Sequence, residues 1–239
     1  MKRFLILIIL ACLLSACAKQ EKVKTTLPLE TLGAETVVVT ETEDTLPVVE
    51  TTASISRPIP ADKDFVRVCD YLPGVSQELM YATEGNFTGQ VIYDFQDAYL
   101  RYGTVKKLAG VCQDLAEMGL SLKIWDGFRP VSAQFRLWEV CPDPTYVADP
   151  NVGYSSHSRG NTVDVTLVDE NREELEMPTG FDDFSAKADR DYSDCTAAAA
   201  NNAEILEILM EKHGFTGYAG EWWHYSDTMS YPVEREFDP

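Results

Sequence analysis

The chain of 239 residues is strongly acidic, since 39 Asp and Glu against 20 Lys and Arg give a formal net charge of -19. So negative a surface disfavours nucleic acid and anionic lipid headgroups as partners, because both carry charge of the same sign. The net charge says nothing about the fold class, which has to come from the elements that the sequence predicts.

The first residues are typical of an export signal. Lys2 and Arg3 precede an apolar run over residues 5–14 that is too short for a comfortable membrane span. Leu-Ser-Ala-Cys at residues 14–17 resembles a bacterial lipoprotein box. It predicts a signal peptide of residues 1–16 and acyl chains on Cys17 that anchor the protein to a membrane. An ordinary secretory signal or an uncleaved anchor is the alternative.

Residues 17–60 predict a flexible tether, because they are rich in Thr, Glu, Val and Pro and contain no aromatic residue. About 40 flexible residues would span roughly 35 Å. The remaining residues, 61–239, are enough for one compact domain with its own core. We therefore expect an exported lipoprotein on the periplasmic or outer cell surface.

Four of the six cysteines fall in the predicted domain: Cys69, Cys112, Cys141 and Cys195. An even number in an exported chain permits two disulfides, whose connectivity the sequence leaves open. No Cys-x-x-Cys spacing supports a cysteine-based zinc site.

The first half of the domain mixes strands and helices. Residues 65–80 are expected to enter a sheet, and apolar residues recur at helical spacing over residues 105–116, before Gly119. Residues 120–125 predict a strand that ends at Asp-Gly-Phe-Arg-Pro, and Pro130 can then begin a helix over residues 131–140.

The second half predicts a helix from about residue 196 to 213, followed by Gly214. Its inward-facing residues are Ile205, Leu206, Leu209 and Met210. His213, in the last turn, is expected to interact with the negative end of the helix rather than to bind a metal. A final strand covers residues 221–225. Separated helices and a small, mostly antiparallel sheet predict an α+β fold.

Two stretches far apart in the sequence indicate a metal site. Ser-Ser-His-Ser-Arg-Gly-Asn-Thr-Val-Asp at residues 155–164 offers His157 and Asp164, and Glu-Trp-Trp-His at residues 221–224 offers His224. Three nitrogen and oxygen ligands with a fourth position for water are the pattern of a catalytic zinc site. Two of the three histidines of the chain lie in these stretches.

Residues 162–168 alternate, with Val163, Val165 and Leu167 on one face and Asp164 on the other. This pattern predicts a half-buried strand whose polar side borders a cleft. Gly160 supplies a turn that lets His157 and Asp164 converge.

Glu221 would lie beside the metal, where a general base is needed. Residues three apart on a regular strand point to opposite faces, so we expect an irregular strand or bulge at Gly220 and Glu221. The alternative is a Trp-rich core strand with a chance histidine. Trp222 and Trp223 are expected to be packing residues, one towards the site and one towards the core.

These two stretches resemble those of the zinc D,D-peptidases that share a fold with Hedgehog signalling domains. They have the pattern Ser-x-His-x-x-Gly-x-x-x-Asp, followed later in the chain by Glu-x-Trp-His. Three further stretches resemble the VanX-type D-alanyl-D-alanine dipeptidases among them: Tyr-Ala-Thr-Glu-Gly-Asn-Phe-Thr-Gly at 81–89, Trp-Asp-Gly-Phe-Arg-Pro at 125–130 and Met-Pro-Thr-Gly-Phe-Asp-Asp-Phe at 177–184. The resemblance runs from about residue 65 to the end. Thr162 departs from the usual Ala at a position that is not a ligand.

The resemblance implies one Zn²⁺ per chain, with Glu221 as the base. It also implies that Arg129 stabilises the oxyanion of the reaction. From the residues alone, a surface salt bridge would be the better interpretation of Arg129.

The same resemblance places Asp182 opposite the ammonium group of a short substrate, although the neighbouring Asp183 stays open as an alternative. Ser155 is a candidate hydrogen-bond partner for the substrate, and its alternative is capping of the local turn. The remaining candidates, expected to shape the substrate pocket, are Tyr81, Asn86 and Phe87.

The sequence therefore predicts a membrane-tethered zinc dipeptidase that cleaves D-alanyl-D-alanine or related D-dipeptides in peptidoglycan turnover. A D,D-carboxypeptidase acting on wall stem peptides and a metal-containing binding module without turnover are the alternatives. Glu221 argues against the binding module, and the stretches at 81–89 and 177–184 argue against the carboxypeptidase.

Overall fold

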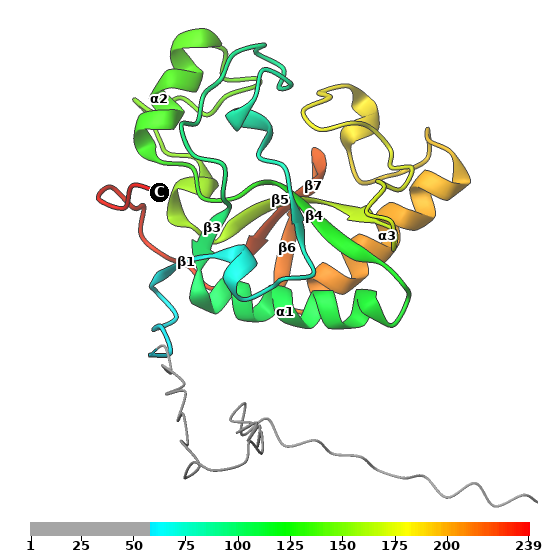
Figure 1. Cartoon of the computed structure of the whole chain (residues 1–239). Coiled ribbons are helices and arrows are strands. Elements are labelled where there is room, and N and C mark those ends of the chain that lie inside the picture. The colour runs from blue at the N-terminus through cyan, green and yellow to red at the C-terminus, as the bar shows by residue number, and fades with distance from the viewer. Residues whose placement is uncertain (1–57) are drawn as a thin grey trace, which may run out of the picture. The chain divides into compact units, whose positions relative to one another are not determined.

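The computed structural model describes residues 58–239 (Figure 1). The predicted signal peptide, Cys17 and nearly all of the tether lie outside these residues. Within the described part, no helix is long and apolar enough to cross a membrane.

A five-stranded sheet forms the centre of the domain. Its strands, in spatial order, are β2 (Ser76–Gln77), β4 (Ser121–Asp126), β5 (Thr162–Val168), β7 (Glu221–Asp227) and β6 (Phe215–Tyr218). Every neighbouring pair is antiparallel except β2 and β4, which are parallel. The strands β5 and β7, far apart in the sequence, lie side by side in the middle.

A second, two-stranded sheet pairs β1 (Phe65–Arg67) with β3 (Tyr99–Arg101). The stretch 65–80, predicted to enter a sheet, is therefore divided between the two sheets. The chain between the regular elements also forms short 3-10 helices: η1 (Val68–Asp70), η2 (Met80–Ala82), η3 (Ser156–Arg159) and η4 (Ala186–Ala188).

Three α-helices complete the part of the chain that the structure describes: α1 (Tyr102–Ala116), α2 (Val131–Val140) and α3 (Ala197–Lys212). Figure 1 shows α1 and α3 on one side of the five-stranded sheet, and α2 with the long loops on the other side. The buried residues of α1 and α3 that form the core include Val105, Leu108, Val111, Leu115, Ala203, Leu206 and Met210. Both helices are followed by a left-handed glycine, Gly119 and Gly214, as the sequence predicts.

The strand β5 is buried over its whole length, so the prediction of a half-buried strand is wrong. It is the central strand of the sheet, with helices on one face and loops on the other. Burial therefore extends to the polar side chains of Thr162, Asp164 and Thr166. A central strand covered on both faces does not need an exposed side.

The four cysteines of the described domain, Cys69, Cys112, Cys141 and Cys195, are free thiols. The two disulfides that the even number permits are not formed. Burial raises the pKa of the Cys112 thiol to about 12, which keeps that thiol protonated and unreactive at neutral pH.

The predicted α+β class, with a small and mostly antiparallel sheet, is confirmed. Of the inward-facing residues predicted for α3, Leu206 and Met210 are fully buried, while Ile205 and Leu209 pack partly buried against the core. Trp222 and Trp223 are both completely buried and pack against each other, as expected of packing residues.

Candidate metal centre

The 3-10 helix η3 holds His157 in place. Ser155 precedes this helix and its hydroxyl accepts a hydrogen bond from the His157 backbone N–H (3.3 Å). Gly160 then ends the helix with φ of +74°, a left-handed conformation that favours glycine. A Cβ atom at this position would also lie 2.3 Å from the Phe65 ring. The turn predicted at Gly160 is therefore present, and it leads directly into β5.

Asp164 and His224 lie directly opposite each other on β5 and β7. Side chains of directly opposite residues in an antiparallel pair project to the same face of the sheet. The pairing of two strands thus brings together residues that are far apart in the sequence.

The strand β7 is irregular on its other side, where it pairs with β6. Gly217 faces Tyr225, but the next residue, Tyr218, faces Glu221, so the register shifts between them. This irregularity brings Glu221 to the same side as His224, with 3.5 Å between Glu221 Oε2 and His224 Nδ1. The predicted irregularity is present and lies just after Glu221.

Three of the predicted residues, His157, Asp164 and His224, offer ligand atoms that all lie within 4.8 Å of one another. His157 Nε2 is 3.4 Å from Asp164 Oδ2 and 3.4 Å from His224 Nδ1. His224 Nδ1 is 3.0 Å from Asp164 Oδ1. Two imidazole nitrogens and a carboxylate therefore converge on one point.

The other nitrogen of each imidazole has a partner outside this group. His157 Nδ1 lies 2.8 Å from the Gly127 carbonyl oxygen, to which it can only donate. His224 Nε2 lies 3.3 Å from the Ser156 hydroxyl. A proton on each of these outer nitrogens leaves the lone pairs of His157 Nε2 and His224 Nδ1 free for a cation.

The environment of Asp164 fits a cation at this point. Its Oδ1 is buried and accepts no hydrogen bond, although His224 Nδ1 is close. Burial alone would raise the pKa of the carboxyl group, but nearby positive charge lowers it well below its usual range; in the metal-free protein protonated His157 and His224 supply that charge. A buried carboxylate oxygen without a donor, facing two nitrogen lone pairs, is the donor set of a divalent transition metal such as zinc.

Glu221 borders this cluster without being part of it. Its side chain is 26% exposed, and burial raises the pKa of its carboxyl group above the ordinary value. A carboxyl group with a raised pKa beside a metal position suits proton transfer near neutral pH.

Arg129 is buried, so the surface salt bridge considered from the sequence is not what the structure shows. Its Nη2 donates to Asp126 Oδ2 (2.7 Å), its Nε to the Tyr93 hydroxyl (3.1 Å) and its Nη1 to Gln134 Oε1 (3.0 Å). The guanidinium also lies over the Tyr81 ring (4.8 Å). A guanidinium has five N–H groups. These three bonds therefore hold the cation in place, and further N–H groups remain for a substrate.

Asp182, rather than Asp183, is turned into the domain. Its Oδ2 accepts a hydrogen bond from the Tyr81 hydroxyl (2.7 Å), and its backbone is left-handed, with φ of 54°. Burial raises the pKa of its carboxyl group to about 7. Asp183 is exposed and accepts a bond from the Ser185 backbone.

The remaining candidates have structural partners of their own. Asn86 donates to the Thr83 and Gln90 carbonyls (both 2.7 Å) and accepts from Thr88, so it shapes its loop from within. Phe87 is 36% exposed and packs edge-on against Tyr81. Ser155 has the capping role that the sequence analysis gave as its alternative.

The third histidine is not part of the cluster. His213, which follows α3, has its Nε2 2.6 Å from Oδ2 of Asp114 on α1. Sequence reasoning assigned no role to Asp126 and Tyr93, which hold Arg129, although Asp126 lies in the Trp-Asp-Gly-Phe-Arg-Pro stretch. Sequence reasoning also missed Arg190, which donates hydrogen bonds to the backbone carbonyl oxygens of Glu221 and His224; nothing in its sequence surroundings points to this contact.

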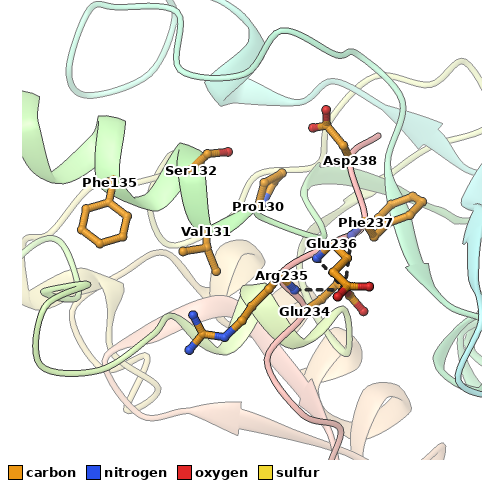
Figure 2. Close-up of a pocket in the computed structure, with 9 residues that line it drawn as sticks. All are labelled: Pro130, Val131, Ser132, Phe135, Glu234, Arg235, Glu236, Phe237 and Asp238. Carbon is orange, nitrogen blue, oxygen red and sulfur yellow. Dashed lines mark hydrogen bonds between the residues drawn. The ribbon is translucent and has the colours of Figure 1, made fainter.

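A cavity of about 520 Å³ lies elsewhere, between the start of α2 and the C-terminal segment (Figure 2). Its lining includes Val131, Phe135, Arg235 and Asp238 but no residue of the histidine–aspartate cluster. The chemistry of the donor atoms, not the size of this cavity, therefore identifies the site.

The α+β fold and a buried cluster of two histidines and an aspartate beside a glutamate define a metal-dependent hydrolase. Residues 61–238 match the family described as D-Ala-D-Ala dipeptidase. The chain belongs to this family and is a metallopeptidase.

Several curated relatives are similar over most of their length. The D-alanyl-D-alanine dipeptidase of Escherichia coli (strain K12) is 37% identical, over 71% of this chain and 89% of that protein. The D-alanyl-D-alanine dipeptidase of Enterococcus faecalis is 33% identical, over 69% of this chain and 91% of that protein. The D-alanyl-D-alanine dipeptidase of Streptomyces coelicolor is 35% identical, over 68% of this chain and 91% of that protein.

Proposed function

We propose that the protein is a zinc-dependent dipeptidase that hydrolyses D-alanyl-D-alanine outside the cytoplasm, in the turnover of peptidoglycan. The observation that carries the proposal is the convergence of His157, Asp164 and His224 with Glu221 at their side. Membership of the D-Ala-D-Ala dipeptidase family supports the substrate class.

The chemistry follows from the positions of these groups. Zinc bound by His157, Asp164 and His224 would act as a Lewis acid and would lower the pKa of water towards neutrality. Glu221 takes a proton from the attacking water and passes it to the leaving amine. Arg129, fixed as a cation by Asp126, stabilises the negative oxygen that develops on the scissile carbonyl.

Recognition of a free dipeptide requires a partner for its ammonium group. Asp182 supplies a carboxyl group that is held by Tyr81 and is near enough to Asp164 and Glu221 to interact with both electrostatically. The neighbouring Phe181 packs inward against Trp125 and Tyr81, which fixes the loop from the other side. An acidic group held at a fixed distance from the metal suits a substrate of two residues.

Aromatic contacts join three loops on this side of the domain. The Phe184 ring packs against Phe87 (5.3 Å between centroids) and against Tyr146 (5.0 Å). The loop that contains Phe184 also carries Asp182. Loops tied together in this way favour a small substrate over the end of a long wall peptide, which would need an open cleft.

The proposed location rests on the sequence before the domain. The apolar run at residues 5–14 and Cys17 after Leu-Ser-Ala support an exported lipoprotein. An enzyme at that location meets dipeptides released from the wall, which favours turnover over the removal of a cytoplasmic precursor.

The test is hydrolysis by the purified protein loaded with zinc. The substrates are D-alanyl-D-alanine, its L,L isomer and a wall pentapeptide that ends in D-alanyl-D-alanine, and free D-alanine is measured with and without a chelator. Chelator-sensitive cleavage of the free D,D-dipeptide alone is expected. Cleavage of the pentapeptide would identify a carboxypeptidase, and cleavage of none would overturn the proposal in favour of a binding module.

A further inference from the structure

The irregular end of β7 leaves backbone carbonyl groups without strand partners. Since Gly217 faces Tyr225, a regular ladder would place Tyr218 opposite His224, but it faces Glu221 instead. The β7 residues from Trp222 to His224 are therefore not paired with β6. Carbonyl groups that lose their strand partner inside a domain need hydrogen-bond donors from elsewhere.

Arg190, from the loop before α3, supplies these donors. Its Nη2 lies 3.0 Å from each of three carbonyl oxygens, those of Glu221, Trp222 and His224. Its Nε donates to the Tyr218 carbonyl oxygen on β6 (2.8 Å). One guanidinium thus contacts both strands across the point where their register shifts.

The guanidinium itself is held from several directions. Its Nη1 donates to the Tyr225 hydroxyl (3.0 Å), and its carbon lies 4.4 Å from the centre of the Tyr225 ring. Glu207 on α3 supplies the opposite charge at 3.5 Å. The side chain of Arg190 is only 11% exposed, so its contacts are shielded from water.

Gly217 provides the room for this arrangement. A Cβ atom at Gly217 would lie 2.4 Å from the central carbon of the Arg190 guanidinium. Real Cβ contacts are essentially never so short. Any larger residue at this position would have to displace the arginine.

We propose that Arg190 is a positioning residue for the metal centre. By satisfying the carbonyls of residues 221, 222 and 224, it maintains the irregular backbone that turns both Glu221 and His224 towards Asp164. A planar fork of five N–H groups is required, because the single ammonium of a lysine cannot reach carbonyls on both strands. The inference rests on the proposed function only where activity is measured.

The first test compares Arg190→Lys and Arg190→Met with the unchanged protein. We expect zinc affinity, measured by competition with a chromophoric chelator, to fall about 10- to 100-fold, as for other groups that support metal ligands. Hydrogen exchange at the amides of residues 221–225 in the metal-free protein should accelerate, while exchange in α1 stays unchanged. With D-alanyl-D-alanine, kcat should fall more than KM rises.

A second variant reaches the same contact from the other side. Gly217→Ala retains the arginine but displaces its guanidinium, so it should reproduce the weaker zinc binding and the faster exchange. The matched control is Thr104→Val, which removes a buried hydrogen bond (2.9 Å) to Asp227 at the far end of β7. It should lower the Tm and leave zinc affinity unchanged.

Wild-type zinc affinity and unchanged exchange at residues 221–225 in both Arg190→Lys and Gly217→Ala would overturn the proposal. So would an equal loss of zinc affinity in Thr104→Val, because the effect would then be one of general stability. A wild-type protein that binds zinc but hydrolyses no peptide would overturn the proposed function and leave this inference to be decided by the binding and exchange results.

Discussion

At the scale of single residues, the proposed mechanism gives Glu221 and His224 different tasks within one strand. Glu221 lies 3.5 Å from a ligand nitrogen yet outside the set of ligand atoms. Glu221→Gln should therefore bind zinc as the wild type does, while hydrolysis falls by about 10² to 10⁴, the usual contribution of a general base. Zinc content and the rate of D-alanine release are measured on the same sample, and a variant that keeps the wild-type rate would remove Glu221 from the mechanism.

The Asp182 carboxyl group should make the stability of the metal-free protein depend on pH. Burial raises the pKa of Asp182 from 3.8 to about 7 in the folded chain, so the folded state binds the proton more tightly than the unfolded state. Its contribution to the free energy of unfolding is then fully present below about pH 4 and is lost as the pH rises through 7.

Asp182→Asn should accordingly reduce the fall in Tm between pH 5 and pH 8. Asp183→Asn is the control, because this exposed carboxyl group has a pKa lowered by its bonds to Ser185 and is already ionised over that range. Equal pH profiles for the wild type and Asp182→Asn would show that Asp182 is not the titrating group.

At the scale of the elements, the turn between η3 and β5 depends on one glycine. Gly160→Ala places a side chain on a left-handed backbone and against Phe65, so we expect a loss of about 1 to 3 kcal/mol in the free energy of unfolding. Zinc affinity should fall as well, because η3 carries His157. The control is Gly74→Ala, where a Cβ atom meets nothing within 4 Å. Denaturant unfolding measures the free energy of unfolding of both variants. Equal values for Gly160→Ala and Gly74→Ala would contradict the prediction.

The helices were predictable because their limits are marked by local chemistry. Pro130 fixes the start of α2 and Pro142 follows its end, so the predicted range 131–140 matches the structure. Thr196 caps α3 by accepting from the Ala199 N–H, and Gly214 follows its end. These signals act within a few residues and can be read from the sequence alone.

The strands β3 and β6 were not predicted, because they are short and are defined by partners elsewhere in the chain. β6 has four residues, and its pairing with β7 breaks after Gly217. The grouping of His157, Asp164 and His224 could be predicted, since histidine and carboxylate chemistry is visible in the sequence. Arg190 could not, because its partners are mainly backbone carbonyls, which every residue carries.

At the scale of the whole domain, the C-terminal segment braces the element that carries His157. Glu234 N donates to the Ser158 carbonyl (2.8 Å), and Arg159 donates to the Tyr231 carbonyl (2.8 Å). Phe237 stacks on the Phe65 ring with 4.3 Å between centroids. The end of the chain is thus attached to η3 from one side while β5 leaves it on the other.

Deletion of residues 230–239 should therefore lower both the Tm and the zinc affinity. Glu234→Ala should cause part of this loss, since it removes the contact with Arg101 (3.1 Å) and the acceptor for three backbone N–H groups. Asp238→Ala, at the end of the chain, serves as the control. A truncated protein with unchanged zinc affinity would show that η3 keeps its shape without the segment.

The pairing of Asp164 with His224 joins parts of the chain that are 60 residues apart (224 - 164), with α3 and β6 between them. A zinc ion bound by both residues would be a removable cross-link across the domain. A metal that binds only the folded chain adds about 2.7 kcal/mol when its free concentration is one hundred times its Kd. Molecules without zinc would then be both inactive and the first to unfold, so the supply of the metal would affect the amount of folded enzyme as well as its activity.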